Sequence, residues 1–171
     1  MTITQRNIIV VSMIPNLIEI AGSPWKLLPA GVHLATLSEV SDLFGKNPVR
    51  RRQYDGLVMA CKALSQASCR IIYLDGSYVT GKPSPGDYDV CWDPTGISVA
   101  DLDPTFLIFD NKREVQKLKY EGEFFPFSLD AGNGQSFFEF FQTDRHSGER
   151  KGILAIDLTS ETFDFSGGRK S

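Results

Sequence analysis

Long apolar segments are missing from this sequence, and so is a strong excess of charge of either sign. A membrane-spanning helix needs a run of about 18 or more apolar residues, and because no such run occurs we expect no membrane partner. The chain has 18 Lys and Arg residues against 21 Asp and Glu residues, which gives a net charge of -3. This balance argues against a protein that coats nucleic acid by charge alone, although it leaves room for a local basic groove.

Cysteine and histidine are scarce as well. The three cysteines, Cys61, Cys69 and Cys91, are odd in number and lack the paired spacing of a zinc site. Reduced thiols in a cytoplasmic protein are the simplest interpretation. The two histidines, His33 and His146, have no partner at the spacing of a zinc site or a catalytic triad.

The length of 171 residues suits one domain with its own apolar core. Residues 8–11 are apolar and are predicted as a buried or edge strand, since they lack the length and the cleavage site of a signal peptide. Residues 21–35 contain two glycines and two prolines and are predicted to be irregular. We therefore divide the chain into an N-terminal arm, residues 1–27, and one domain, residues 28–171.

Apolar periodicity and capping residues predict the helices and strands. Thr36 and Glu39 have the spacing of a capping box and predict a short helix. A longer helix is predicted over residues 49–65, where apolar side chains recur at three- and four-residue steps. A further helix is expected over residues 112–120, and strands over residues 70–74, 87–92, 123–129 and 151–158. This order indicates an α+β (α/β-like) domain, in which helices flank a small mixed β-sheet.

Two features of the sequence concern charge and aromatic residues. Arg50–Arg52 fall in the first turn of the longer helix, where the helix dipole disfavours positive charge, so a charged partner or solvent is expected there. Nine of the twelve phenylalanines lie from Phe124 to Phe165, so the C-terminal third is expected to supply much of the core. The Phe-rich stretch 137–141 is likewise assigned to the core, and Asp144 and Arg145 after it can pair with each other.

The segment that carries chemical information runs from Leu74 to Val90. A hydrophobic strand ends at Gly76-Ser77, a turn-rich stretch follows, and Asp87-x-Asp89 then opens a second hydrophobic strand. Glycine lets the backbone approach a phosphate closely, and Ser77 offers a hydroxyl and an N–H group to phosphate oxygens. The first half of the segment is therefore a candidate nucleotide-binding bend.

Asp87 and Asp89 are the candidate metal ligands. Side chains two residues apart on a strand share a face, so these carboxylates project to the same side. Such neighbours repel each other unless a cation lies between them, and Mg²⁺ prefers oxygen ligands of this kind. The competing interpretation is turn chemistry, because Pro-Gly-Asp also forms turns. The coincidence with Gly76-Ser77 favours a metal and triphosphate site.

This segment resembles the signature of the polymerase β-type nucleotidyltransferase superfamily, in which a Gly-Ser turn is followed by Asp-x-Asp. The chain also resembles a family of small, uncharacterised nucleotidyltransferase-like proteins from bacteria and phages over residues 28–158. The stretches that carry this second resemblance are Leu28–His33, Asn47–Arg51, Phe140–Arg145 and Lys151–Ile153. The resemblance implies a minimal nucleotidyltransferase fold that binds Mg²⁺, or Mn²⁺, through Asp87 and Asp89.

The resemblance also implies a third carboxylate, which serves as a metal ligand or as the base that accepts the proton of the attacking hydroxyl. Glu123 is the first candidate and Asp157 is the second. Related small nucleotidyltransferases that act as antitoxins carry an arginine in the loop after Gly-Ser. The loop here has none, and Lys82 is the candidate to replace it in nucleotide binding.

Two functions are consistent with these residues. The first is an Mg²⁺-dependent nucleotidyltransferase that moves a nucleoside monophosphate from a nucleoside triphosphate to a hydroxyl of a protein, an RNA or a small molecule. The second is a nucleotidyltransferase-fold binding module without turnover, such as an antitoxin or regulator that acts by contact. The resemblance makes a protein partner such as a toxin conceivable, whereas the net charge does not indicate nucleic acid.

Overall fold

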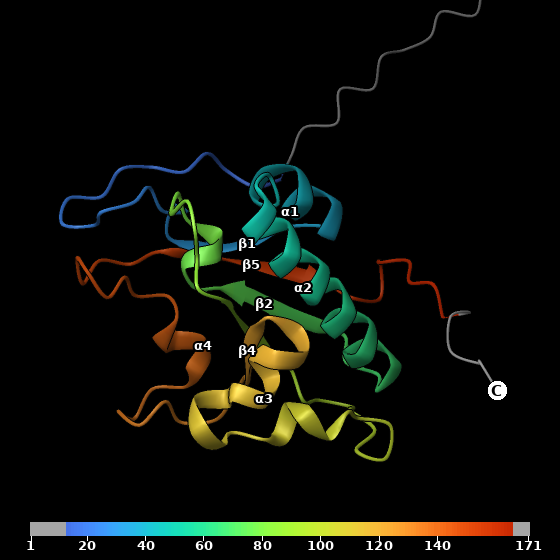
Figure 1. Ribbon diagram of the computed structural model, residues 1–171. Helices are drawn as coiled ribbons and strands as arrows, with labels where there is room; N and C mark the ends of the chain where they lie inside the picture. The colour runs from blue at the N-terminus through green and yellow to red at the C-terminus, as the bar shows by residue number, and fades with distance from the viewer. Residues whose placement is uncertain (1–12, 166–171) are drawn as a thin grey trace, which may run out of the picture.

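The structure is a computed structural model that describes residues 13–165 of the chain (Figure 1). Its helices are α1 (Leu37–Phe44), α2 (Pro48–Gln66), α3 (Asp110–Tyr120) and α4 (Phe137–Phe140), with two 3₁₀ turns, η1 (Ser77–Val79) and η2 (Pro104–Leu107). Its strands are β1 (Gly31–Leu34), β2 (Ile71–Asp75), β3 (Tyr88–Trp92), β4 (Gly122–Pro126) and β5 (Gly152–Asp157). The expected α+β class is confirmed.

The five strands form one mixed sheet in the order β1-β5-β2-β3-β4. β1 runs parallel to β5 and β3 runs parallel to β4, whereas β2 is antiparallel to both of its neighbours. Helices α1 and α2 cover one face of this sheet (Figure 1). On β2, Ile72 and Leu74 are fully buried in the core, while Tyr73 turns to the other face and its ring lies 4.8 Å from that of Phe138. Segments around α4 therefore pack on the face opposite α1 and α2.

Capping residues determine where the two N-terminal helices begin. Thr36 and Glu39 form the predicted capping box of α1, in which each side chain accepts a hydrogen bond from the other residue's backbone N–H. Asn47 caps α2 by accepting from the Arg50 N–H at 2.9 Å, and Pro48 occupies the first turn, where its missing N–H costs nothing. None of the helices within residues 13–165 is both long and apolar enough to cross a membrane.

The expectation that residues 21–35 are irregular was wrong at their C-terminal end. Residues 31–34 form β1, whose register with β5 pairs Val32 with Ile153 and His33 with Leu154. A partner strand from the far end of the chain outweighs the local glycine and proline signals. The predicted strand at residues 8–11 lies outside the described residues.

The C-terminal third contributes to the core through Tyr120, β4 and β5, but most of its phenylalanines do not. Of the nine from Phe124 to Phe165, only Phe124 and Phe125 are buried, and Phe140 is 44% exposed. The core instead draws on α2, β2, β3 and β5, with the fully buried rings of Tyr78, Tyr88 and Phe106. Residues 137–141 form a half-buried aromatic cluster on the sheet face opposite α1 and α2.

Candidate active site

The bend after β2 requires glycine at its first position. Gly76 has a φ angle of +82°, which L side chains rarely adopt. A Cβ atom at this position would also collide with the Asp89 carboxylate. Ser77 then begins η1, so the Gly-Ser bend packs directly against one of the two candidate metal ligands.

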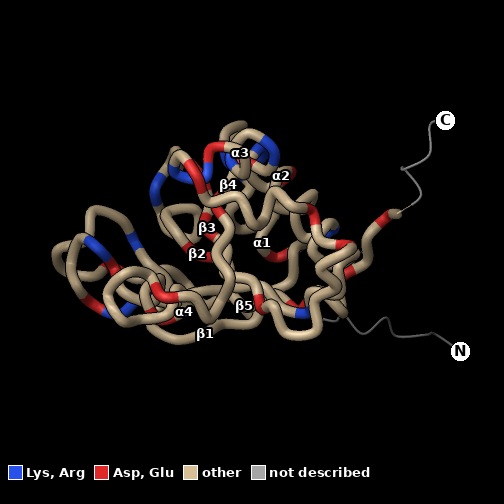
Figure 2. The backbone as a smooth tube through the Cα atoms, turned by 90° about the horizontal axis from the view of Figure 1, so that it is seen from below, with Lys and Arg blue, Asp and Glu red and all other residues tan. Residues whose placement is uncertain are grey.

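Three acidic side chains lie side by side across three strands. Asp75 on β2 pairs in register with Asp89 on β3, and Asp89 pairs with Glu123 on β4. Residues that face each other across neighbouring strands point to the same side of a sheet, so these carboxylates form one row. Tyr88 points the other way into the core, where its hydroxyl donates to the Tyr120 carbonyl at 2.6 Å. Figure 2 shows acidic positions gathered where β2 and β3 meet.

Burial raises the pKa values of Asp75, Asp87 and Asp89, and neighbouring negative charge raises those of Asp87 and Asp89 further. Burial is the main cause that raises the pKa of Asp89 well above its usual range, and the charge of Asp87 is the next. Burial also raises the pKa of Asp87, with a further contribution from Glu123. Asp75 has a pKa raised by burial to about 6, which Lys151 opposes from 3.3 Å between its Nζ and Asp75 Oδ1. Ionising these carboxyl groups together is therefore costly, and a cation between them would lower that cost.

The donor set fits a cation that is bound together with a nucleotide. Within residues 13–165, no group of three or more His, Cys, Asp or Glu side chains is placed to hold a metal ion by itself. Mg²⁺ is usually held by one or two carboxylates, with substrate phosphates and water completing its shell. Asp87 and Asp89 meet this requirement for Mg²⁺ or Mn²⁺.

Glu123, the first candidate for the third carboxylate, joins the predicted pair. It lies next to Asp89 across the parallel β3–β4 ladder. Its Oε1 accepts from Lys117 Nζ at 2.7 Å, and the same ammonium lies 3.9 Å from Asp87 Oδ2. Lys117 of α3 thus partly neutralises the carboxylates of Glu123 and Asp87.

Asp157, the second candidate, lies elsewhere. It is opposite Ile71, at the other end of β2 from Asp75. Its exposed carboxylate accepts hydrogen bonds from the backbone and side chain of Thr159 at 2.9 and 2.6 Å. The structure therefore leaves Asp157 outside the carboxylate row.

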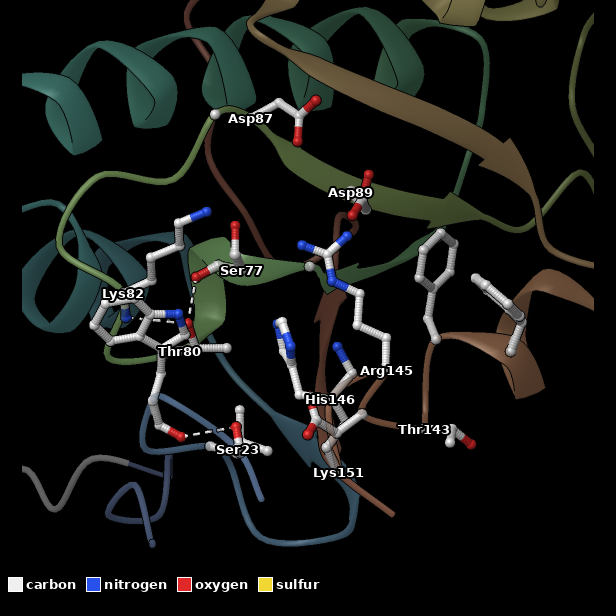
Figure 3. A pocket seen from close by; sticks show the side chains of 17 residues that line it. Ser23, Ser77, Thr80, Lys82, Asp87, Asp89, Thr143, Arg145, His146 and Lys151 are labelled. Carbon is white, nitrogen blue, oxygen red and sulfur yellow. Dashed lines mark hydrogen bonds between the residues drawn. The ribbon is translucent and has the colours of Figure 1, made fainter. Parts of the chain in front are cut away.

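The bend and the two aspartates open into one pocket of about 380 Å³ (Figure 3), a size typical of small-molecule sites. Lys82, predicted to contact the nucleotide, lines this pocket, and Figure 3 shows its amino group close to Ser77. Arg145 enters from the other side of the pocket, with its guanidinium between Ser77 and Asp89 in this view. Trp25, Leu27, Phe140 and Phe141 supply the apolar part of the wall. The pocket thus combines carboxylates, cations and aromatic rings.

Arg50 holds the loop that joins the Gly-Ser bend to the aspartates. Its side chain is only 6% exposed and extends from the first turn of α2. The guanidinium donates to the carbonyls of Tyr78 at 2.6 Å and Thr80 at 2.9 Å. The helix dipole disfavours a cation in the first turn of α2. The hydrogen bonds to loop carbonyls compensate for this, and no carboxylate partner is needed.

Two further side chains near the start of α2 also hold this loop. Asn47 Nδ2 donates to the Pro83 carbonyl at 2.8 Å, and Gln53 Nε2 donates to the Pro85 carbonyl at 2.6 Å. Helix α2 and its cap therefore hold the loop that leads to Asp87 and Asp89.

The sequence interpretation missed three charged residues of the site. Asp75 is not among the predicted site residues but lies in the carboxylate row, and Lys151, predicted only as the start of a strand, pairs with it. Arg145 was paired with Asp144, yet the Asp144 carboxylate accepts from the Ser147 N–H and hydroxyl instead. Lys151 and Arg145 reach the pocket only through long-range contacts, whereas Asp75 directly precedes the Gly-Ser bend and its place in the row follows from the β2–β3 register.

Residues 23–157 match the sequence model described as "Family of unknown function (DUF6932)". The chain belongs to this family. The DUF6932 segment begins before β1 and ends at the last residue of β5, so it contains the whole sheet and every residue of the pocket. No curated protein and no solved structure matches the chain.

Proposed function

We propose that this DUF6932 protein is an Mg²⁺-dependent nucleotidyltransferase. It moves a nucleoside monophosphate from a nucleoside triphosphate to a hydroxyl of a protein, an RNA or a small molecule. The observation that carries the proposal is the convergence of Asp87 and Asp89 on the Gly76-Ser77 bend, inside a pocket that also presents cations. The resemblance to the polymerase β-type signature supports the same assignment.

Each element of the site has a chemical task in this proposal. The N–H groups and hydroxyl of Gly76-Ser77 bind phosphate oxygens, and Asp87 and Asp89 hold the cation. A bound Mg²⁺ or Mn²⁺ would supply neutralisation of the charge that develops on the phosphates. The acceptor oxygen bonds to the α-phosphorus, the bond to the bridging oxygen breaks, and pyrophosphate leaves. Glu123 is the candidate to take the acceptor's proton.

One observation favours a second function, a binding module without turnover. The Glu123 carboxylate is engaged by Lys117 at 2.7 Å, which occupies one of the oxygens that would take the acceptor's proton. A protein of this kind would keep its nucleotide or partner surface and act by contact, as an antitoxin or regulator of a partner such as a toxin.

Label transfer separates the two functions. The protein is incubated with each of the four labelled ribonucleoside triphosphates, Mg²⁺, and candidate partner proteins or RNA. We expect label on an acceptor with the wild type and a loss of at least about 100-fold in the Asp87→Ala/Asp89→Ala double variant, because the cation is no longer held. Asp157→Ala serves as the matched control and should retain transfer, since Asp157 lies apart from the row.

The outcomes lead to different conclusions. Transfer that persists in the double variant would refute the site assignment. Nucleotide binding without transfer to any acceptor would favour the binding module. Absence of nucleotide binding would refute the nucleotidyltransferase. The three free, buried cysteines support the proposed location in the cytoplasm.

A further inference from the structure

Arg145 is carried on a rigid turn that projects into the pocket. The Asp144 side chain is 4% exposed and accepts from the Ser147 N–H at 2.9 Å and the Ser147 hydroxyl at 2.7 Å. The backbone closes the same turn through bonds from the Gly148 N–H to Asp144 O and from the Asp144 N–H to Glu149 O, both 2.8 Å. A turn held by four hydrogen bonds keeps the following side chain in a defined place.

The Arg145 guanidinium faces the acidic site without a direct ion pair. Figure 3 shows it between Ser77 and Asp89, and its charge acts on the pKa of Asp87. Within residues 13–165, the ion pairs closer than 4.0 Å do not include Arg145. The neighbouring Asp144 carboxylate is occupied by Ser147. The positive charge is therefore aimed into the pocket and remains available to a ligand.

The two lysines of the pocket, Lys151 and Lys82, differ in their contacts. Lys151 is 13% exposed in its side chain and is paired with Asp75 at 3.3 Å. Lys82 lies on the loop held by α2 and approaches Ser77 from the side away from Arg145 (Figure 3). Two cations on either side of the bend thus flank the place where phosphate oxygens would lie in the proposed function.

We infer that Arg145 binds the phosphate chain of the nucleotide and selects for a triphosphate. A guanidinium presents several N–H donors in a plane and binds two phosphate oxygens in a fixed bidentate geometry, whereas a lysine ammonium acts as a point charge. Arg145 supplies from a distant turn the positive group that the loop after Gly76-Ser77 lacks. This inference rests on the proposed function, and its test separates the two.

The test is calorimetric titration with Mg²⁺-tripolyphosphate, each of the four Mg²⁺-ribonucleoside triphosphates, and the matching monophosphates. Tripolyphosphate contains the phosphate chain without a base, so base preference does not affect it. Arg145→Ala should weaken binding of tripolyphosphate and of the preferred triphosphate by at least about tenfold, which corresponds to about 1.4 kcal/mol. Binding of the monophosphate should change much less, and Arg145→Lys should fall in between.

Arg70→Ala is the matched control, because it removes the same charge from an exposed arginine just before β2, away from the pocket. The inference would be wrong if Arg145→Ala bound tripolyphosphate as tightly as Arg70→Ala while the Asp87→Ala/Asp89→Ala variant lost binding; the proposed function would survive that result. Equal losses for monophosphate and triphosphate would also overturn it. Wild-type protein that binds none of these ligands would refute both the inference and the proposed function.

Discussion

At the scale of single residues, a buried arginine holds the loop between the Gly-Ser bend and Asp87 in place. Arg50 is one of three consecutive arginines, and the sequence alone does not show which of them is buried. In the structure Arg50 is 6% exposed, whereas the Arg52 side chain is 63% exposed and pairs with Glu121 at 3.4 Å. The helix dipole favoured a charged partner or solvent for this cluster, but Arg50 is buried and donates to neutral loop carbonyls.

We predict that Arg50→Ala lowers the free energy of unfolding by about 3 kcal/mol, because several carbonyls lose their donor and each buried unsatisfied group costs about 1–3 kcal/mol. Arg52→Ala on the same helix should cost less than about 1 kcal/mol, as exposed ion pairs do. Urea unfolding followed by tryptophan fluorescence measures both. Equal losses in the two variants would contradict the role assigned to Arg50.

The residues of the candidate site divide by how local their signals are. Gly76, Ser77, Asp87 and Asp89 could be predicted because a bend and a strand start are short-range features of one segment. Arg145 reaches the same pocket only through the turn that precedes β5, and its sequence neighbours suggested an ion pair instead. Side chains brought in by tertiary contacts leave no spacing pattern to read.

At the scale of elements, one glycine allows two helices to approach each other. Gly56 is buried in α2, and a Cβ atom there would collide with the carbonyl oxygen of Tyr120, the last residue of α3. The next strand, β4, carries Glu123, so this close contact helps to place the third carboxylate.

We predict that Gly56→Ala destabilises the protein by about 1–3 kcal/mol through overpacking against backbone. This sign is opposite to that expected from helix propensity, where alanine is better than glycine by about 1 kcal/mol. Thermal and urea unfolding give the measurement. Asp55→Ala, at the exposed neighbouring position, should leave stability unchanged or raise it, and a stabilised Gly56→Ala would show that α3 moves away at no cost.

Helices and most strands were predictable because their signals are caps and apolar periods. The capping box at Thr36 and Glu39 fixed the start of α1, and α2 extends one residue beyond the predicted range at each end. β1 was missed because it depends on β5, whose residues lie far away in sequence. The number of phenylalanines in the C-terminal third did not predict their burial. Several of them pack on the sheet face opposite α1 and α2, and composition does not show which face a side chain occupies.

At the scale of the whole molecule, the acidic row links stability to pH and to divalent cations. Folding raises the pKa of Asp89 well above its usual range and that of Asp75 to about 6. Stability from such a group is complete below the unfolded-state pKa and is lost as pH rises through the folded-state pKa. The ionised row therefore weakens the fold at neutral pH when no cation is bound.

We predict that Asp89→Asn raises the free energy of unfolding near pH 7.5 by about 1 kcal/mol or more, because one unit of pKa shift corresponds to about 1.4 kcal/mol. The gain should shrink near pH 4.5, where the wild-type carboxyl is protonated in the folded state. Mg²⁺ should raise the melting temperature of the wild type at the higher pH but not that of Asp89→Asn. Urea and thermal unfolding test both effects.

The control for this experiment is Asp42→Asn, at an exposed position of α1. It should respond to pH and Mg²⁺ as the wild type does. A lower free energy of unfolding for Asp89→Asn near pH 7.5 would contradict this prediction. It would mean that other groups of the protein already stabilise the Asp89 carboxylate without a bound cation.

The place of β5 in the sheet has a consequence for synthesis on the ribosome. Because β5 fills the gap between β1 and β2, a chain that stops before Lys151 contains the whole segment from Gly76 to Asp89 but leaves those two strands without their shared neighbour. Such a product also lacks the lysine that pairs with Asp75. Prematurely terminated chains would therefore carry the segment from Gly76 to Asp89 without a folded pocket around it, and the pocket would form only after translation through β5.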